Sequence, residues 1–174
     1  MNVSLDVYEH ARIALARMAK ELEPALFDAA TTPTLGLKGS ASDVSFHTFI
    51  DPRSWTATDT SSEVVAIRYA LSPADSKVLM RYLANSDANS FPAIPLGEDN
   101  GEELARGITA LSFEYFASAA DFYSGTAVAN WDSSAAGSAA LPALIRIRVS
   151  VVDNKELRAP QTFETVIHLR SGSP

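Results

Sequence analysis

The amino-acid sequence predicts an α+β fold in which a long N-terminal α-helix is packed on one or more antiparallel β-sheets. Near the N-terminus, apolar residues recur at steps of three and four, which is the spacing of a helix with one buried face. From residue 43 onward, apolar and polar residues alternate, which is the period of half-buried strands. No later helical pattern is long enough to connect parallel strands, so we expect the strands to be joined by hairpins.

The predicted helix lies within residues 1–30. Its apolar stripe consists of Tyr8, Ala11, Leu15, Met18, Leu22 and Ala25. Glu9, Ile13 and Lys20 fall on the opposite face, where we expect solvent or a partner. Pro24 has no backbone N–H to donate, so it is expected to kink or end the helix.

The β-rich region is predicted over residues 43–170, with roughly six strands. They are expected at 43–50, 63–71, 77–84, within "LARGITALSFEYFAS", at 143–152 and at 161–171. The turn "SPADS" makes the second and third of them a hairpin. Glu164 on the last strand is placed to pair with Arg146 or Arg148 on the strand before it. The Ala- and Ser-rich runs at 117–120 and 133–140 are predicted to be loops.

Composition excludes several classes of protein. A chain of 174 residues is expected to form one domain, 1–174, whose core is large enough to need no disulfide or metal. The chain contains no cysteine, which excludes disulfides. The formal net charge of -7 repels phosphate, so we expect no nucleic-acid partner. The apolar runs are shorter than the ~20 residues of a membrane helix, and the N-terminus does not have the pattern of a signal peptide.

No constellation of catalytic residues emerges from the sequence, so we expect a protein that is not an enzyme and has no cofactor. His10, His47 and His168 fall on three different predicted elements, and a partly exposed structural role is expected for each. The serines are not set in the strained turn that makes a hydrolase nucleophile.

Two features suggest binding. The acidic segment "GEDNGEE" offers Glu98, Asp99 and Glu102 as weak calcium ligands, although a solvated acidic turn is the favoured interpretation because the spacing of an EF-hand is missing. Trp55 and Trp131 stand beside polar loops. Each is expected to hold its loop onto the sheet, with a stacking platform for a sugar or a peptide as the alternative.

The order of segments carries a resemblance to a known family. A helix containing "ARIALARMAKELEPAL" is followed by "VVAIRYAL" and "KVLMRYLA", then "LARGITALSFEYF", the tryptophan segment "ANWDSS", and finally "LPALIRIRVSVVD" and "QTFETVIHLR". Over nearly the whole chain, this order resembles the J-type minor pseudopilins of type II secretion, the GspJ family.

The resemblance implies a pilin-like fold and a structural role in protein export. Members of this family assemble with the I-, K- and H-type minor pseudopilins at the tip of a short pseudopilus in the bacterial inner membrane and periplasm. The resemblance also implies a leader and a hydrophobic helix segment upstream of Met1. That helix segment would be the only contact with the membrane, and the domain without it would be soluble. Glu9, Ile13, Lys20 and Trp131 are the expected partner-interface residues.

Two alternatives stay open at this point. The chain is also compatible with a minor pilin of a type IV pilus or competence system, which uses the same kind of subunit. A stand-alone module that binds a small ligand or a carbohydrate through Trp55 or Trp131 becomes the better hypothesis if Met1 is the native start.

Overall fold

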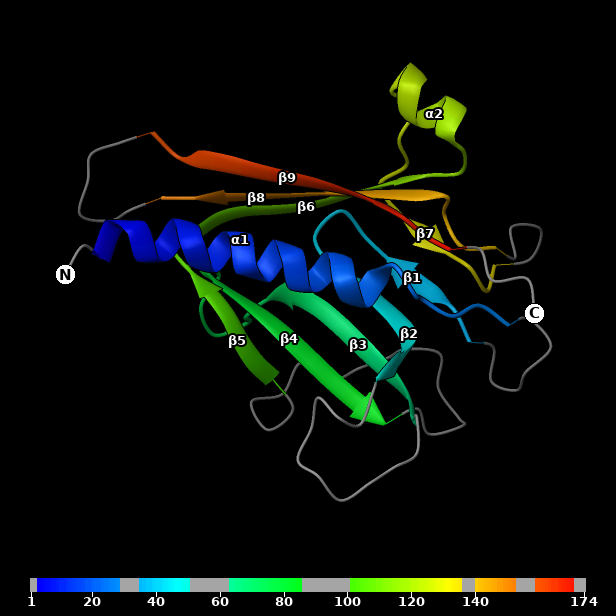
Figure 1. The fold of residues 1–174 in the computed structure, drawn as a ribbon, viewed down its shortest axis with the longest axis horizontal. Helices are drawn as coiled ribbons and strands as arrows, with labels where there is room; N and C mark the ends of the chain where they lie inside the picture. The colour runs from blue at the N-terminus through cyan, green and yellow to red at the C-terminus, as the bar shows by residue number, and fades with distance from the viewer. Residues whose placement is uncertain are drawn as a thin grey trace.

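The structure, a computed structural model, describes residues 3–28, 35–50, 63–85, 101–135, 140–152 and 159–170. Within these ranges the chain forms two helices and nine strands (Figure 1). In chain order they are α1 (Val3–Leu22), β1 (Leu37–Gly39), β2 (Val44–Ile50), β3 (Glu63–Leu71), β4 (Val78–Asn85), β5 (Gly101–Arg106), β6 (Ile108–Phe116), α2 (Ala119–Ser124), β7 (Trp131–Asp132), β8 (Leu144–Val151) and β9 (Gln161–His168).

The strands form two sheets in which all neighbours are antiparallel. The larger sheet has six strands in the order β5-β4-β3-β2-β1-β7, and the smaller has three in the order β6-β8-β9. The hairpin predicted around "SPADS" is confirmed, since β3 pairs with β4. In β8 the residues 145, 147, 149 and 151 are buried, as the alternation of the sequence predicts.

Gly107 is the point where the chain leaves the larger sheet and enters the smaller one. Its φ of 75° is a left-handed conformation that glycine adopts without steric cost. The N–H of Ile108, directly after it, donates to the carbonyl oxygen of Lys77 at 3.0 Å, and the N–H of Val152 donates to the carbonyl oxygen of Gly107 at 3.0 Å. The segment between β5 and β6 is therefore a fixed corner that both sheets hold in place.

The two sheets and α1 share one apolar core. From the helix, Ala11, Leu15, Met18 and Leu22 are buried in it, as the predicted stripe requires. α1 contacts β2 and β5 of the larger sheet and β8 and β9 of the smaller one. In Figure 1 it runs lengthwise between the strands of the two sheets. The helix ends at Leu22, just before Pro24, as expected.

The predicted fold class is wrong. The described residues are mostly strand, they form two antiparallel sheets, and they contain only one long helix, so the chain is not an α+β, pilin-like fold with a helix laid on one sheet. The prediction is wrong because the alternation in "LARGITALSFEYFAS" indicates a single strand, whereas Gly107 divides this segment between two sheets. Alternation shows which face of a strand is buried and does not show which sheet the strand joins.

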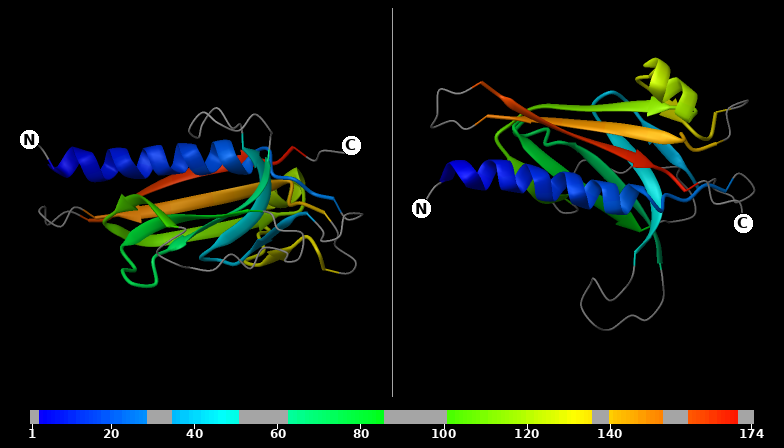
Figure 2. Two further views of the ribbon diagram at one scale, coloured as in Figure 1. Left: turned by 90° about the horizontal axis from the view of Figure 1, so that it is seen from below. Right: turned by 45° about the horizontal axis from the view of Figure 1, so that its top comes forward.

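A short helix replaces one predicted loop. The run at 117–120 leads into α2, where the Ser118 hydroxyl accepts a hydrogen bond from the N–H of Asp121 at 3.2 Å. Gly125, with a φ of 75°, ends the helix. Figure 2 shows α2 standing outside the two sheets. The other run, 133–140, lies partly outside the described residues.

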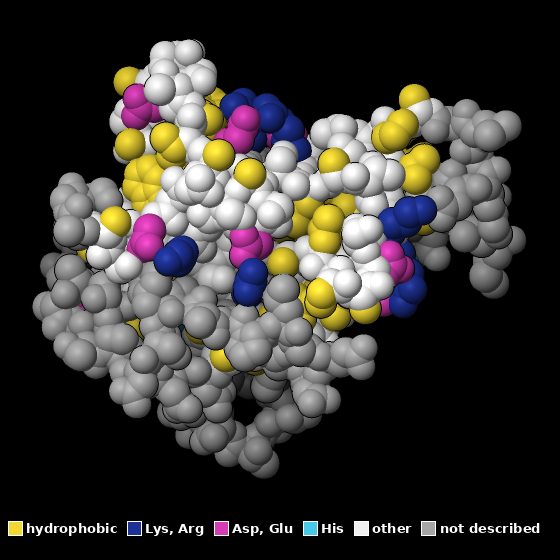
Figure 3. All heavy atoms as spheres, turned by 180° about the vertical axis from the view of Figure 1, so that it is seen from behind, with side chains coloured by type: hydrophobic (Ala, Val, Ile, Leu, Met, Phe, Trp, Pro, Cys, Tyr) yellow, Lys and Arg dark blue, Asp and Glu magenta, His cyan; other side chains and the backbone are white. Residues whose placement is uncertain are grey.

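Ion pairs bridge neighbouring strands of the smaller sheet. The Nε atom of Arg148 lies 2.6 Å from a carboxylate oxygen of Glu164 on β9, which confirms one of the two predicted pairings. Arg146 instead pairs with Glu114 on β6, at 2.6 Å. Figure 3, which shows the side opposite to that of Figure 1, has basic and acidic side chains next to one another in small groups. The exposed pair of Arg148 with Glu164 stabilises the fold only slightly, whereas Arg146 and Glu114 are partly buried.

Tyr115 of β6 ties the smaller sheet to the larger one. Its ring is fully buried, and its hydroxyl lies 3.0 Å from the carbonyl oxygen of Ser40 and 3.2 Å from that of Asp43, to which it donates. Burial, together with the negative charge of Asp43, raises the pKa of Tyr115, so the hydroxyl stays a donor at all ordinary pH values. A Cβ added at Gly39 would lie 1.9 Å from this hydroxyl oxygen.

Gly39→Ala is expected to lower the free energy of unfolding by about 1–3 kcal/mol, because the added methyl group must displace the buried phenol of Tyr115. Urea denaturation followed by circular dichroism measures the change.

The matched control is the same substitution in a Tyr115→Phe background, where the hydroxyl nearest to the new methyl group is absent. There we expect Gly39→Ala to cost less than in the unmodified chain. Strictly additive effects of the two substitutions would show that the hydroxyl oxygen of Tyr115 is not the atom that the methyl group displaces.

Candidate functional site

A cavity lies at the end of the larger sheet where β1 pairs with β7. Its volume is about 550 Å³, within the range of about 300–1,000 Å³ that is usual for small-molecule sites. The residues that line it come from β1, the turn after β1, β2, β3 and the β7 segment. Those with polar or aromatic groups include Lys38, Asp43, Arg68, Asn130, Trp131 and Asp132.

Two ion pairs form the polar walls of the cavity. Lys38 and Asp132 are directly opposite one another on β1 and β7, with 3.1 Å between Nζ and Oδ2. Arg68 lies 2.7 Å from Asp43, measured from Nη2 to Oδ2. Partial burial acts to raise the pKa of Asp132, but hydrogen bonds from Ser134 and Lys38 outweigh it, so the pKa is lowered and the carboxylate stays ionised at neutral pH.

Trp131 joins the two ends of the loop that follows β7. Its indole N–H donates to the carbonyl oxygen of Ala140 at 3.0 Å, and its half-buried ring packs against the core. The fully buried Ser133 fixes the start of the same loop. Its N–H donates to the carbonyl oxygen of Leu37 at 2.9 Å, and its hydroxyl accepts from the N–H of Leu37 at 2.8 Å. Trp55, the other tryptophan, lies outside the described residues.

A buried arginine holds α1 on the larger sheet. Arg81 of β4 is only 3% exposed, and its Nε donates to a carboxylate oxygen of Glu21 on α1 at 2.9 Å. The hydroxyl of Tyr69 on β3 donates to the same carboxylate oxygen. Arg17, one helical turn before Glu21, makes two hydrogen bonds to Glu102 on β5, at 2.7 and 2.9 Å. Residues of α1, β3, β4 and β5 thus form one network.

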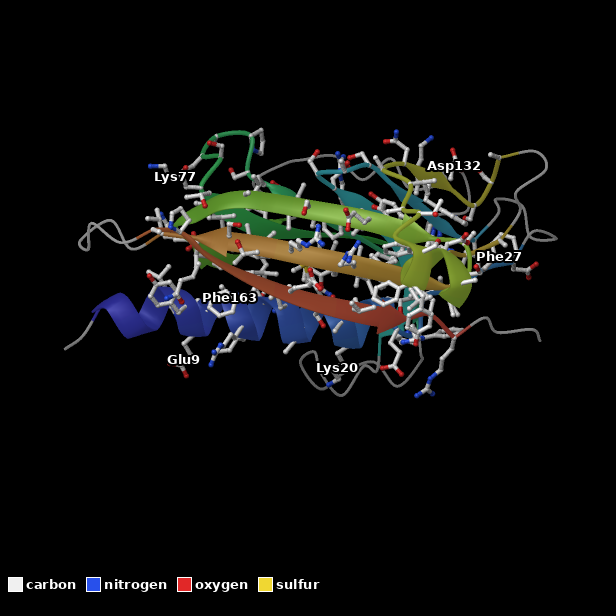
Figure 4. The ribbon with its side chains drawn as sticks, turned by 90° about the horizontal axis from the view of Figure 1, so that it is seen from above. Glu9, Lys20, Phe27, Lys77, Asp132 and Phe163 are labelled. Carbon is white, nitrogen blue, oxygen red and sulfur yellow. The ribbon has the colours of Figure 1, made fainter. Side chains whose placement is uncertain are left out.

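The exposed face of α1 carries three of the predicted interface residues. Ile13 is 57% exposed, and Glu9 and Lys20 are also exposed. Figure 4 shows Glu9 and Lys20 on the α1 side of the molecule, with Asp132 on the opposite side. Trp131 is adjacent to Asp132, so the four predicted interface residues do not form one surface.

Of the three candidate calcium ligands, the structure describes only Glu102. Glu98 and Asp99 lie outside the described residues. Glu102 is on β5, where both carboxylate oxygens accept hydrogen bonds from Arg17. Among the residues that the structure describes, no group of three or more His, Cys, Asp or Glu side chains is placed to hold a metal ion. The described part of the acidic segment therefore faces a cation of the protein itself.

His47 differs from its predicted state. It is only 2% exposed rather than partly exposed, and its Nδ1 accepts a hydrogen bond from the N–H of Gly36 at 3.1 Å. Burial lowers the pKa of His47, despite its contact with the backbone of Gly36, so the imidazole is neutral at pH 7. His10 and His168 are exposed, on α1 and at the end of β9.

The charged residues of the cavity were missed by sequence reasoning. Lys38, Asp43, Arg68 and Asp132 come from four separate segments, and only the strand register brings them together. The sequence feature that could have revealed them is a basic residue opposite an acidic one across the β1–β7 ladder. This feature can be recognised only once the register of the two strands is known.

No protein-family model matches the chain, and no curated protein matches it to a significant degree. Within the described part of the chain, no helix combines the length and hydropathy that crossing a membrane requires. The order of the sequence motifs and the geometry of the described residues therefore support the function proposed below.

Glu21→Gln is expected to lower the free energy of unfolding by about 3 kcal/mol at pH 7, because Arg81 loses its buried counter-charge. Burial acts to raise the pKa of Glu21, but hydrogen bonds from Arg81 and Tyr69 and the charges of Arg81 and Arg17 outweigh it, so the folded-state pKa is lowered. This stabilisation is complete above the unfolded-state pKa of about 4.5 and is lost as the pH falls through the lower folded-state value.

Denaturation curves of the unmodified chain and of Glu21→Gln between pH 7 and pH 3 measure this effect, and the two stabilities are expected to converge at acidic pH. The control is Glu23→Gln, because Glu23 forms an exposed pair with Arg170 at 3.0 Å and should contribute less than about 1 kcal/mol. Equal losses from both substitutions would contradict the importance of the buried network.

Proposed function

We propose that the chain is a J-type minor pseudopilin, a structural subunit that docks with I-, K- and H-type minor pseudopilins at the tip of a type II secretion pseudopilus. In this role it acts in the bacterial inner membrane and periplasm, where it assists assembly and protein export without catalysis. The observation that carries the proposal is the exposed face of α1, on which Ile13 is 57% exposed between Glu9 and Lys20.

This face has the composition of a protein interface. An apolar residue lies at its centre and charged residues lie around it, which is the usual arrangement of a buried core with a polar rim. Glu9 lies four positions before Ile13 and Lys20 lies seven positions after it, so all three side chains emerge on the same side of the helix. α1 runs along the length of the molecule and presents this face over several turns (Figure 2).

The face is also rigid, which favours a role in assembly. The opposite side of α1 is buried in the core, and Arg81 and Tyr69 fix Glu21 near its C-terminal end. A docking surface that is held in place before binding loses little conformational entropy on association.

Support for the proposal comes from the order of the sequence motifs and from the surface of α1. The predicted fold class gives no support, because the two-sheet architecture differs from it. A minor pilin of a type IV pilus or competence system is the second candidate, since it would use the same helix face. The two candidates differ in which minor subunits bind.

Ile13→Asp is expected to weaken binding to the I- and K-type minor pseudopilins of the same genome at least tenfold, because the carboxylate would be desolvated at the centre of the interface. Isothermal titration calorimetry with the purified subunits measures the affinity, and thermal denaturation checks that the variant is folded.

The matched control is Val128→Asp, which places the same charge at another apolar residue that is 44% exposed and lies outside α1. This variant is expected to bind like the unmodified chain. Equal binding by all three proteins would exclude α1 as the docking face. Binding to type IV minor pilins alone would favour the second candidate.

A further inference from the structure

The cavity between β1 and β7 is not used by the proposed docking face. Figure 4 shows Asp132, one of the residues that line the cavity, on the opposite side of the molecule from Glu9 and Lys20. A ligand bound there would therefore give the protein a property independent of assembly through α1.

Polar side chains of the cavity form a single row across one face of the larger sheet. The register places Lys38 of β1 opposite Asp132 of β7 and opposite Ser45 of β2. Ser45 is in turn opposite Arg68 of β3. Residues directly opposite one another on neighbouring strands share one face of the sheet, and all four line the cavity. The register therefore fixes the order of these groups.

Ser45 lies between two cations in this row. Lys38 is one strand away on one side and Arg68 is one strand away on the other, at the usual strand spacing of about 5 Å. Ser45 is only 5% exposed, so the sheet holds it in place. An anionic group seated over Ser45 would accept a hydrogen bond from its hydroxyl and would have a cation on either side. This part of the cavity favours a carboxylate.

Two carboxylates lie beside these cations. Asp43 is two residues before Ser45, so it falls on the same face, and its Oδ2 atom lies 2.7 Å from Nη2 of Arg68. Asp132 lies 3.1 Å from Nζ of Lys38. The four charges that line the cavity therefore cancel, so a simple anion and a simple cation would each be repelled as well as attracted.

A ligand that carries one positive and one negative group matches this arrangement. Two pairs of opposite charges attract one another when they lie in reverse order, because each charge then faces its opposite. In an α-amino acid the ammonium and the carboxylate are attached to the same carbon atom. With the carboxylate over Ser45, the ammonium group can point along β2 toward Asp43. The lining residues are mostly polar, which favours a small or polar side chain on the ligand.

The turn that carries Asp43 is fixed before any ligand binds. The N–H of Ser40 donates to the carbonyl oxygen of Asp43 at 2.8 Å, and the Ser40 hydroxyl donates to the Asp43 carboxylate. The hydroxyl of Tyr115 lies 3.0 Å from the carbonyl oxygen of Ser40 and 3.2 Å from that of Asp43. A site formed in advance avoids much of the entropic cost of binding.

We propose that this cavity binds a zwitterionic α-amino acid with a small or polar side chain. The ligand carboxylate accepts from the Ser45 hydroxyl and lies between Lys38 and Arg68, and the ligand ammonium donates to Asp43. This inference goes beyond the proposed function and does not depend on it, because none of these four residues belongs to the α1 face.

The test is an NMR titration of the ¹⁵N-labelled unmodified chain, at low ionic strength, with glycine, alanine, serine, asparagine and glutamine. We expect at least one of them to bind with a dissociation constant of about 1 mM or lower. The largest changes in amide chemical shift are expected within residues 38–45, because the ligand lies over that part of the sheet.

Two derivatives of the amino acid that binds best test its two charges separately. The N-acetyl derivative has no ammonium group, and the amide derivative has no carboxylate. Each is expected to bind at least tenfold more weakly than the amino acid, because each leaves one pair of opposite charges unmatched.

Two substitutions test the assigned contacts. Asp43→Asn is expected to weaken binding of the amino acid about tenfold and to leave the N-acetyl derivative no weaker, because only the ammonium group bonds to Asp43. Lys38→Gln is expected to weaken the amino acid about threefold, and this side chain is 60% exposed, so the fold tolerates the change. Thermal denaturation checks that both variants are folded.

The matched controls are Glu103→Gln and Arg106→Gln, which alter an ion pair of β5 outside the cavity. Both are expected to bind the amino acid like the unmodified chain.

The proposal is overturned if no amino acid binds below about 10 mM, if either derivative binds as tightly as the amino acid, or if inorganic phosphate binds more tightly. Equal losses of affinity in the cavity variants and the controls would overturn it as well. Loss of partner binding in Ile13→Asp would leave these results unaffected, so the two proposals fail or succeed separately.

Discussion

The left-handed backbone conformation of Gly107 is the constraint on which the architecture depends. It turns the chain between β5 and β6, so that two consecutive strands join different sheets. A Cβ at this position would lie 3.1 Å from the carbonyl oxygen of Val152 and 3.1 Å from Cγ1 of Val7, in addition to the strain of its positive φ. With β6 in the smaller sheet, Tyr115 reaches the turn between β1 and β2 and holds Ser40 and Asp43, two residues that line the cavity.

Two sheets that meet at such a corner leave one side of their core uncovered, and α1 closes it. The small and medium-sized side chains of its buried stripe, from Ala11 to Leu22, fill that side. The apolar stripe selects the face of the helix that is buried, and the buried contact between Arg81 and Glu21 adds a directional constraint on its rotation. An arginine that is 3% exposed would be strongly unfavourable without this carboxylate, so a rotation of α1 that separates Glu21 from Arg81 is costly. That rotation also places Ile13 in solvent.

The sequence was sufficient to predict the local elements and insufficient for their assembly. Periodicity identified the stripe of α1, the β3–β4 hairpin and the buried face of β8, because each of these depends on residues close together in the chain. The division into two sheets depends on the conformation of Gly107, and a glycine within an alternating pattern is compatible with a bend or with a continuous strand. Trp131 was recognised as a candidate, but the ion pairs around it depend on the register between β1 and β7, separated by about ninety residues of chain.

The separation of the two surfaces has a consequence for assembly. The α1 face and the cavity lie on opposite sides of the core, and they are held by different contacts, Arg81 with Glu21 in one case and Tyr115 with Ser40 in the other. A partner bound along α1 therefore leaves the β1–β7 edge uncovered by that contact. Coupling between the two sites would require a change in the close-packed core between them, and such cores do not deform continuously. Changes at the β1–β7 edge are thus expected to leave docking through α1 unaffected.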